Sequence, residues 1–264
     1  MSFSQKYRFY KSPNVCGILP GTETEGEAIL YMSHYDHFGI GKAINGDSIY
    51  NGAQDNASGT AALITLAYAY SSNPPKRSIL FLATTGEESS MLGSEYYATH
   101  PIIPLENTII GFNMDMMSFY GRQSGFILDP IEFTDAIDQI KKLGEELSSQ
   151  LLPDFKGSGA FRTDAFPLYS RGVIVPSVHL DGEYLTLTKD DIEKTKQQIG
   201  DFYHLPNDEV YSTFRYDGVI QQMEIIYHIG RFYAEGDEKP KLLPKNPYNA
   251  PMRFYKLKHD KGIF

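Results

Sequence analysis

Three short apolar runs in this chain lead directly into side chains that can bind a metal ion or exchange a proton. The runs span residues 27–33, 77–84 and 108–114, and the side chains that follow are His34, the pair Glu87 and Glu88, and Asp115. Apolar runs of this length are typical of buried strands. Ligand sites in open α/β sheets gather at the carboxyl ends of the strands, so these side chains can converge without further assumptions.

Helical patterns alternate with the expected strands. Helices are expected after Asp55 and at residues 91–100, 132–151, 187–198 and 216–233, and further extended segments at residues 6–19 and 173–180. The alternation predicts a three-layer α/β sandwich with a mostly parallel, mixed central sheet. We expect one domain over residues 1–234, with a Gly- and Asn-rich loop before Asp55. An irregular Lys- and Pro-rich tail is expected over residues 235–264.

The composition excludes several classes of function. A net charge of −9 and a pI near 5.3 argue against nucleic acid or an anionic membrane as the main partner. No apolar run approaches the ~20 residues that a membrane-spanning helix needs. Cys16 is the single cysteine, so the chain has no internal disulfide and no cysteine-based zinc site.

Asp55 stands before a run of small residues, 57–62, that leads into the first expected helix. Small residues allow close backbone approach, and Asp55 would lie at the positive end of the helix dipole. Taken alone, the segment is typical of a capped core helix. Together with His204 and the side chains that follow the strands, it supplies two imidazoles and three carboxylates, with one glutamate to spare. That set suits two divalent ions, most simply zinc, with one bridging carboxylate.

Each of these residues also has an ordinary structural interpretation. A Glu-Glu pair is usually a solvated helix start, and a histidine in a loop is more often a surface or capping residue. Asp36 strengthens the case for His34, because a metal-bound imidazole usually donates its other N–H to a carboxylate. His37 is interpreted as a bystander.

Five motifs occur in the order typical of one known family. They lie at residues 33–37, 52–59, 85–94, 113–116 and 203–208. On these motifs the chain resembles the co-catalytic two-zinc aminopeptidase family, which is related to glutamate carboxypeptidase II, glutaminyl cyclase and the transferrin receptor. The resemblance covers residues 14 to 232.

The resemblance implies two Zn²⁺ ions per chain, with Co²⁺ or Mn²⁺ as other possible ions. It implies ligands His34, Asp55 and Asp115 for one ion, and Asp55, Glu88 and His204 for the other. Asp55 would bridge the ions, and family members often have a cis peptide bond after this aspartate. Glu87 matches the general base. Tyr184 resembles a tyrosine that donates to the oxyanion, although an ordinary loop aromatic is the alternative.

The function implied is that of a metallo-exopeptidase, an aminopeptidase that hydrolyses the N-terminal peptide bond of a substrate with a free α-amine. In this mechanism Glu87 takes a proton from the attacking water and passes it to the leaving amine. The sequence gives no oligomeric state.

Two features depart from the family pattern. Ala165 stands where family members usually have a histidine, and the helical sequence that usually precedes the first strand is missing, so we expect a truncated or processed chain. The N-terminus has no apolar signal region, which fits a cytoplasmic protein or one whose targeting segment was removed. Relatives of this kind are commonly exported, so the resemblance suggests a periplasmic or secreted location.

Three other functions fit the same scaffold. A carboxypeptidase or dipeptidase would share the metal ligands and need a cation for a substrate carboxylate, for which Arg162 is the candidate. Glutaminyl cyclases replace the small residues after the bridging aspartate and typically have Trp before the last histidine, whereas this chain keeps residues 56–59 and has Tyr203 there. A receptor-like domain with a dead site is the non-enzyme alternative, but such relatives lose ligands.

Overall fold

A mixed seven-stranded sheet forms the centre of the protein in the computed structural model, which describes residues 10–130, 134–153 and 159–244. The strand order is β1-β5-β2-β6-β9-β7-β8. The strands are β1 (Val15–Leu19), β2 (Thr24–His34), β5 (Arg77–Thr84), β6 (Thr108–Asn113), β7 (Gln123–Asp129), β8 (Gln150–Leu151) and β9 (Ser177–Tyr184). The four neighbouring strands β5, β2, β6 and β9 run parallel to one another. Strand β1 is antiparallel to β5, and β7 is antiparallel to β9.

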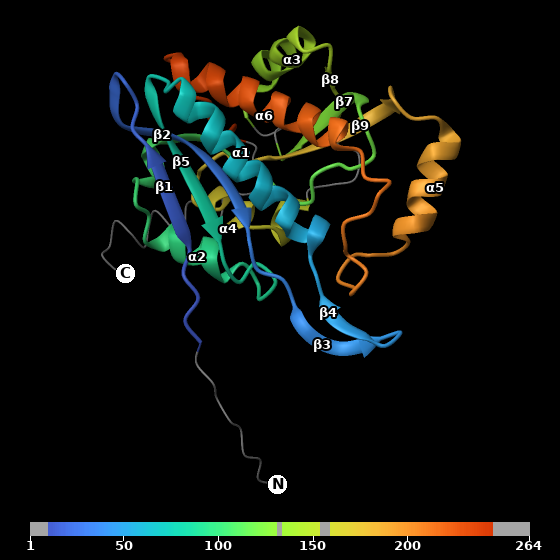
Figure 1. Cartoon of the computed structure of the whole chain (residues 1–264). Coiled ribbons are helices and arrows are strands. Elements are labelled where there is room, and N and C mark those ends of the chain that lie inside the picture. The colour runs from blue at the N-terminus through green and yellow to red at the C-terminus, as the bar shows by residue number, and fades with distance from the viewer. Residues whose placement is uncertain (1–9, 131–133, 154–158, 245–264) are drawn as a thin grey trace.

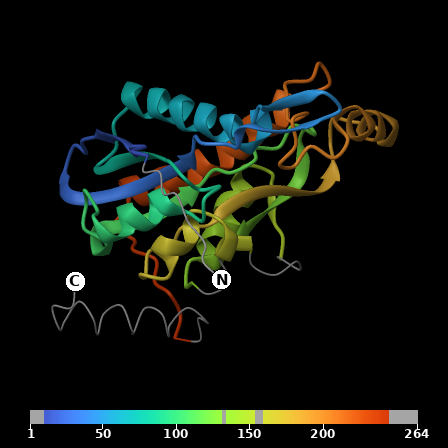
Figure 2. The same ribbon diagram turned by 90° about the horizontal axis from the view of Figure 1, so that it is seen from below.

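Helices cover both faces of this sheet, which confirms the expected three-layer α/β sandwich (Figure 1, Figure 2). One face is covered by α1 (Ser58–Ser72), α3 (Ile137–Glu146) and α6 (Tyr216–Glu235). The other face is covered by α2 (Leu92–Thr99) and α4 (Ala165–Tyr169). Helix α5 (Lys189–Ile199) follows β9 in the sequence and lies beyond the point where this strand ends (Figure 1).

The central strand β2 contributes to two hydrophobic cores because its side chains alternate between the two faces. Ile29 and Tyr31 pack into the core under α1 and α6, whereas Leu30 and Met32 pack into the core under α2 and α4. All four side chains are completely buried. Burial of a side chain of this size contributes about 1.5–3 kcal/mol, so β2 is held firmly from both sides.

The strand register aligns the ends of the three strands that the sequence analysis singled out. His34 at the end of β2 pairs with Thr84 at the end of β5, and Met32 pairs with Asn113 at the end of β6. Since the three strands are parallel neighbours, the segments that follow them all emerge at the carboxyl ends of the strands, on the same side of the sheet.

Several elements differ from the sequence-based expectations. The expected loop before Asp55 contains a hairpin of β3 (Gly39–Ile44) and β4 (Asp47–Tyr50), which projects from the body of the domain (Figure 1). Strand β7 was not expected, α3 is shorter than predicted, and the strand expected over residues 173–180 begins only at Ser177, after Pro176. The remaining short elements are the turns η1 (Ala53–Ala57), η2 (Leu105–Asn107) and η3 (Gly159–Arg162).

The segment after α6 packs back on the domain as far as it is described. Lys239 forms an ion pair with Glu27, and the backbone N–H of Lys241 donates to Asp135 Oδ1 at 2.7 Å. Of the tail expected over residues 235–264, positions 245–264 lie outside the described residues. Among the residues described here, no helix combines the length and the apolar character needed to cross a membrane.

Candidate active site

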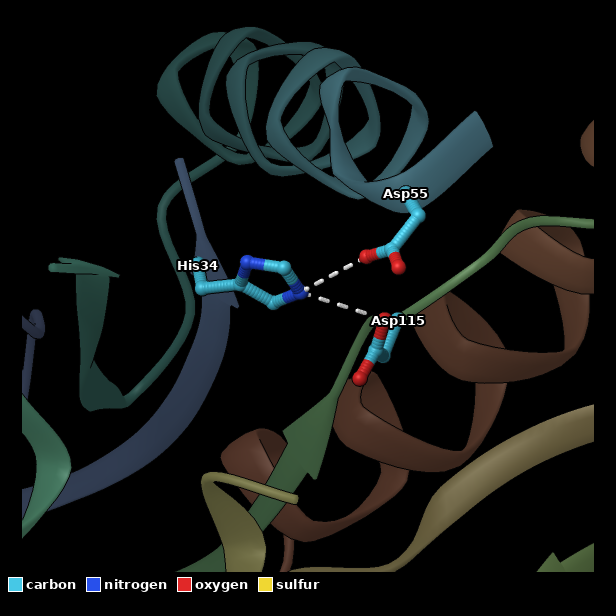
Figure 3. Close-up of side chains that lie close together, drawn as sticks. All are labelled: His34, Asp55 and Asp115. Carbon is cyan, nitrogen blue, oxygen red and sulfur yellow. Dashed lines mark hydrogen bonds and ion pairs between the residues drawn. The ribbon is translucent and has the colours of Figure 1, made fainter. Parts of the chain in front are cut away.

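His34 lies close to the carboxylates of Asp55 and Asp115 at the carboxyl end of β2 (Figure 3). Its Nε2 lies 3.3 Å from Asp55 Oδ1 and 3.3 Å from Asp115 Oδ1. Asp55 comes from the turn before α1, and Asp115 follows β6. The other ring nitrogen, Nδ1, lies 3.1 Å from the backbone carbonyl oxygen of Asp36, which fixes the ring orientation. The three side chains therefore present one nitrogen and two oxygens to a common point.

His204 forms a second group of the same kind. Its Nε2 lies 3.3 Å from Asp55 Oδ2 and 3.3 Å from Glu88 Oε2. His204 comes from the loop between α5 and α6, and the ring of Tyr203 stacks on it with 3.7 Å between ring centroids. The two carboxylate oxygens of Asp55 thus face two different histidines.

These spacings fit a pair of metal ions. Zinc binds imidazole nitrogen and carboxylate oxygen at about 2.0–2.2 Å, so neighbouring ligand atoms of a tetrahedral ion lie about 3.3–3.5 Å apart. Every nitrogen–oxygen pair within the two groups matches that spacing. The ligand atoms of His34, Asp55 and Asp115 lie close enough together for one metal ion, and His204 lies near the other oxygen of Asp55 and near Glu88.

The electrostatic field of the site favours a positive charge. Burial lowers the pKa of His34, but the hydrogen bonds with Asp115 and Asp55 outweigh this effect and raise the pKa to about 12. Burial raises the pKa of Glu87 to about 8, against the opposing charge of His34 and with the help of nearby carboxylates. A carboxyl group with such a pKa can exchange a proton close to neutral pH.

The backbone that carries Asp55 is held by buried hydrogen bonds. Asp208 accepts from the N–H groups of Gln54 and Asp55 at 2.8 and 2.9 Å. The peptide bond between Asp55 and Asn56 is cis, which confirms the expectation drawn from the family resemblance. Asp55 therefore sits in a short non-helical turn that leads into α1.

Asn56 ties this turn to the end of β6. Its side-chain Nδ2 donates to the carbonyl oxygen of Met114 at 2.9 Å, and its Oδ1 accepts from Gly59 N at 3.0 Å. A Cβ atom at Gly59 would lie 2.2 Å from the Met114 carbonyl oxygen, so only glycine allows this approach. These contacts link the backbone beside Asp55 to the backbone beside Asp115.

Asp36 connects β2 to the segment after β5. Its carboxylate oxygens accept hydrogen bonds from the backbone N–H groups of Glu87 and Glu88, at 3.2 and 3.4 Å. The expected contact with His34 is longer, because Asp36 Oδ1 lies 3.8 Å from His34 Nδ1 and the Asp36 carbonyl oxygen is the nearer acceptor. The Asp36 side chain therefore orients the glutamate pair more directly than the imidazole.

A cavity of about 490 Å³ is lined by the neighbours in sequence of Asp55 and Asp115, namely Gln54 and Met116. Tyr184, at the end of β9, also lines this cavity. Arg162 is exposed at the end of η3, and Ala165 is buried at the start of α4. The cavity therefore lies next to the segments that carry Asp55 and Asp115.

Three residues around the site were given no role by the sequence analysis. Asp208 and Asn56 lie within the quoted motifs, Asn56 directly after Asp55 and Asp208 four residues after His204, and this is the signal that could have identified them. The third is His37, whose Nδ1 lies 2.7 Å from Glu88 Oε1. Within the described part of the chain, the groups of possible metal ligands are His34, Asp55 and Asp115, and His37, Asp55 and Glu88, so His37 stands in the second group where His204 was expected.

Comparisons with known proteins identify relatives of the chain. Aminopeptidase YwaD of Bacillus subtilis is 32% identical over 108 residues, which are 40% of this chain and 22% of YwaD. A probable zinc metalloprotease of Pyrenophora tritici-repentis is 35% identical over 85 residues, which are 32% of this chain and 17% of that protein. The chain thus matches less than a quarter of the length of either relative.

Solved structures share the fold. BSAP, a zinc aminopeptidase from Bacillus subtilis, superposes with a TM-score of 0.61 at 19% identity, over 86% of this chain and 50% of BSAP. A Peptidase M28 precursor from Shewanella amazonensis superposes with a TM-score of 0.65 at 22% identity, over 88% of this chain and 47% of the precursor. The model of Peptidase family M28 matches residues 14–228, which is most of the sequence. The chain therefore belongs to peptidase family M28.

Proposed function

We propose that this chain is a zinc-dependent aminopeptidase with two zinc ions, one held by His34, Asp55 and Asp115 and the other by Asp55, Glu88 and His204. The observation that carries the proposal is the position of Asp55. Its two carboxylate oxygens each lie 3.3 Å from a different histidine nitrogen, as a bridging ligand requires.

The donor set supports zinc as the ion. Two imidazoles and three carboxylates are ligands that zinc accepts, and relatives of the chain carry the names zinc metalloprotease and zinc aminopeptidase. Bound zinc would act as a Lewis acid toward the scissile carbonyl and lower the pKa of a bound water.

Glu87 is the proposed general base. It is next to the ligand Glu88, and its backbone N–H is held by Asp36. We propose that its carboxylate takes a proton from the attacking water and then gives that proton to the leaving amine. The raised pKa, near 8, supports a role in which the group is alternately charged and neutral.

The cavity beside Asp115 is the proposed binding site for the N-terminal side chain of the substrate. We propose that the phenol O–H of Tyr184 donates to the developing oxyanion of the scissile bond, and the position of Tyr184 in the lining of this cavity supports that role. The carboxylates around the site would favour the positively charged α-amine of a peptide, which supports cleavage from the N-terminus.

One observation favours a carboxypeptidase or dipeptidase as the second candidate. Burial raises the pKa of Tyr203, and the charge of Arg162 opposes this shift, so the guanidinium lies within electrostatic range of Tyr203. Since Tyr203 stacks on His204, Arg162 could bind a substrate carboxylate near the metal ligands.

The test combines metal analysis with one peptide in four forms, with the N-terminus free or acetylated and the C-terminus free or amidated. Mass spectrometry identifies the bond that is cleaved, with and without a chelator. An aminopeptidase that binds two ions will lose activity on acetylation and keep it on amidation, and chelation will stop cleavage of both forms with a free N-terminus.

Other results assign other functions. Cleavage that amidation blocks and acetylation does not would overturn the aminopeptidase in favour of a carboxypeptidase. Loss of ammonia from a peptide with N-terminal glutamine, without hydrolysis, would identify a glutaminyl cyclase. A protein that binds no metal and cleaves nothing would support the receptor-like alternative.

A further inference from the structure

The proposed ligand set leaves one partly buried histidine of the site, His37, without a function, and the contacts of this histidine are specific. We propose that His37 is a positioning residue, which donates a hydrogen bond from Nδ1 to Glu88 Oε1 so that only Oε2 of this carboxylate is presented to the ion beside His204. The inference rests on the proposed two-ion site.

The distances distinguish a hydrogen-bond partner from a metal ligand. His37 Nδ1 lies 2.7 Å from Glu88 Oε1, whereas the nitrogen–oxygen pairs proposed to share an ion are 3.3 Å apart. A separation of 2.7 Å is typical of a charge-assisted hydrogen bond. An ionised carboxylate can only accept, so the proton lies on Nδ1 of His37.

Glu88 is consequently held at both oxygens. Oε1 receives the His37 hydrogen bond, and Oε2 lies 3.3 Å from His204 Nε2. Without His37, the carboxylate is free to rotate about its terminal bond, because terminal torsions of glutamate are broad. Loss of this orientation would lower the affinity of the protein for the ion that His204 and Glu88 share. The affinity for the ion at His34 and Asp115 would not change.

The fold fixes His37 itself in this orientation. Gly52 has a φ of +70°, and a Cβ atom there would lie 2.8 Å from His37 Cγ, so the backbone approaches the ring closely. Phe38 packs edge-on against His37 and His204, with ring centroids 5.1 and 4.8 Å apart. The other ring nitrogen, Nε2 of His37, is buried and has no hydrogen-bond partner among the residues described, so Nδ1 makes the one directional contact of the ring.

The experiment measures stepwise zinc binding to the metal-free protein by competition with a chromophoric chelator. His37→Ala removes the donor, whereas His37→Asn keeps an amide N–H close to the position of Nδ1. The matched control is His228→Ala, because His228 Nε2, in α6, forms a comparable 2.8 Å contact with Glu146 at the end of α3.

We expect His37→Ala to lower the affinity for one of the two zinc ions about 10–100-fold, as is typical when the hydrogen-bond partner of a metal ligand is lost. The other ion should bind as in the wild type, which also shows that the variant is folded. His37→Asn should restore most of the lost affinity, and His228→Ala should change neither ion. Rescue by asparagine separates positioning from ligation, since an amide is a poor replacement for an imidazole ligand of zinc.

Wild-type affinity for both ions in His37→Ala would overturn the positioning role. Equal loss of both ions, or an asparagine variant no better than alanine, would also overturn it, because the effect would then come from the fold or from direct ligation. A wild-type protein that binds fewer than two ions would refute the proposed two-ion site itself, and this proposal with it.

Discussion

Asp208 accepts a hydrogen bond from the backbone N–H of Asp55, with 2.9 Å between Oδ2 and N. Its other carboxylate oxygen accepts from Gln54, and its own carbonyl oxygen accepts from Ala53 N at 3.0 Å. Asp208 is buried and follows His204 by four residues, so the loop that supplies His204 also fixes the backbone of Asp55. Two proposed ligands that are far apart in the sequence are thus held by one residue.

Replacement of Asp208 by Asn should destabilise the protein, because the amide can accept at one position only and its NH₂ group would face a backbone donor. Hydrogen bonds to charged groups contribute about 1.5–3 kcal/mol, so we expect a loss of that order in the free energy of unfolding of the metal-free protein. Urea denaturation measures it. The control is Asp47→Asn in the exposed hairpin, which removes the charge of a carboxylate that accepts one backbone hydrogen bond at 2.9 Å and should cost less than about 0.5 kcal/mol. Equal losses in both variants would contradict the anchoring role.

Replacement of Asp55 by Ala should remove both metal ions, because its two oxygens face different histidines. His34→Ala and His204→Ala should each remove only one ion, since each imidazole belongs to the ligand set of one proposed ion. Inductively coupled plasma mass spectrometry of the three variants after dialysis counts the ions per chain. Retention of one tightly bound ion by Asp55→Ala would show that Asp55 is not the bridge.

Replacement of Glu87 by Gln should lower kcat about 10²–10⁴-fold, the usual contribution of a general acid–base group. The number of bound metal ions should not change, because Glu87 is not among the proposed ligands. Steady-state hydrolysis of a leucyl anilide, with metal analysis of the same sample, measures both quantities. The matched control is Glu106→Gln, in η2, which should be fully active. Activity of Glu87→Gln within tenfold of the wild type would refute the assignment.

The strands β2 and β6 were predictable from the sequence, because each contains a continuous apolar run that is buried on both faces. The runs before His34 and Asp115 are β2 and β6, and their register brings the strand ends together as expected. Hairpin β3–β4 was not predictable from burial. Side chains such as Ile40 and Ile49 are exposed, so the pattern lacks the alternation that a strand with one buried face produces.

The supporting residues of the site were harder to predict than the proposed ligands. Motif order singled out His34 and His204, but the roles of Asp208 and His37 depend on contacts across more than 50 positions of the sequence. His37 in particular was interpreted as a bystander, because no local pattern shows that its ring meets Glu88. Such long-range hydrogen bonds follow from the tertiary structure and leave no periodic signal.

A partly buried ion pair outside the site, between Arg77 and Glu27, should make the stability of the fold depend on pH. Arg77 Nε donates to Glu27 Oε2 at 2.8 Å, and Glu27 also pairs with Lys239. The hydrogen bond from Lys239, followed by the contact with Arg77, lowers the pKa of Glu27 below its usual value of 4.5, although burial opposes the shift. Because the native pKa is lowered, the contribution to stability is complete above pH 4.5 and is lost as the pH falls through the native pKa.

Replacement of Glu27 by Gln should therefore reduce the free energy of unfolding by about 1–3 kcal/mol at pH 7, since the buried guanidinium of Arg77 loses a charged partner. The difference from the wild type should shrink below pH 4.5, where the wild-type carboxylate becomes protonated. Urea denaturation between pH 3 and pH 7, in the presence of a chelator, measures both effects. The control is Glu193→Gln, which removes an exposed 3.5 Å pair with Lys196 and should cost less than about 1 kcal/mol. A difference between wild type and Glu27→Gln that stays constant over this pH range would mean that Glu27 stabilises the fold by packing rather than by its charge.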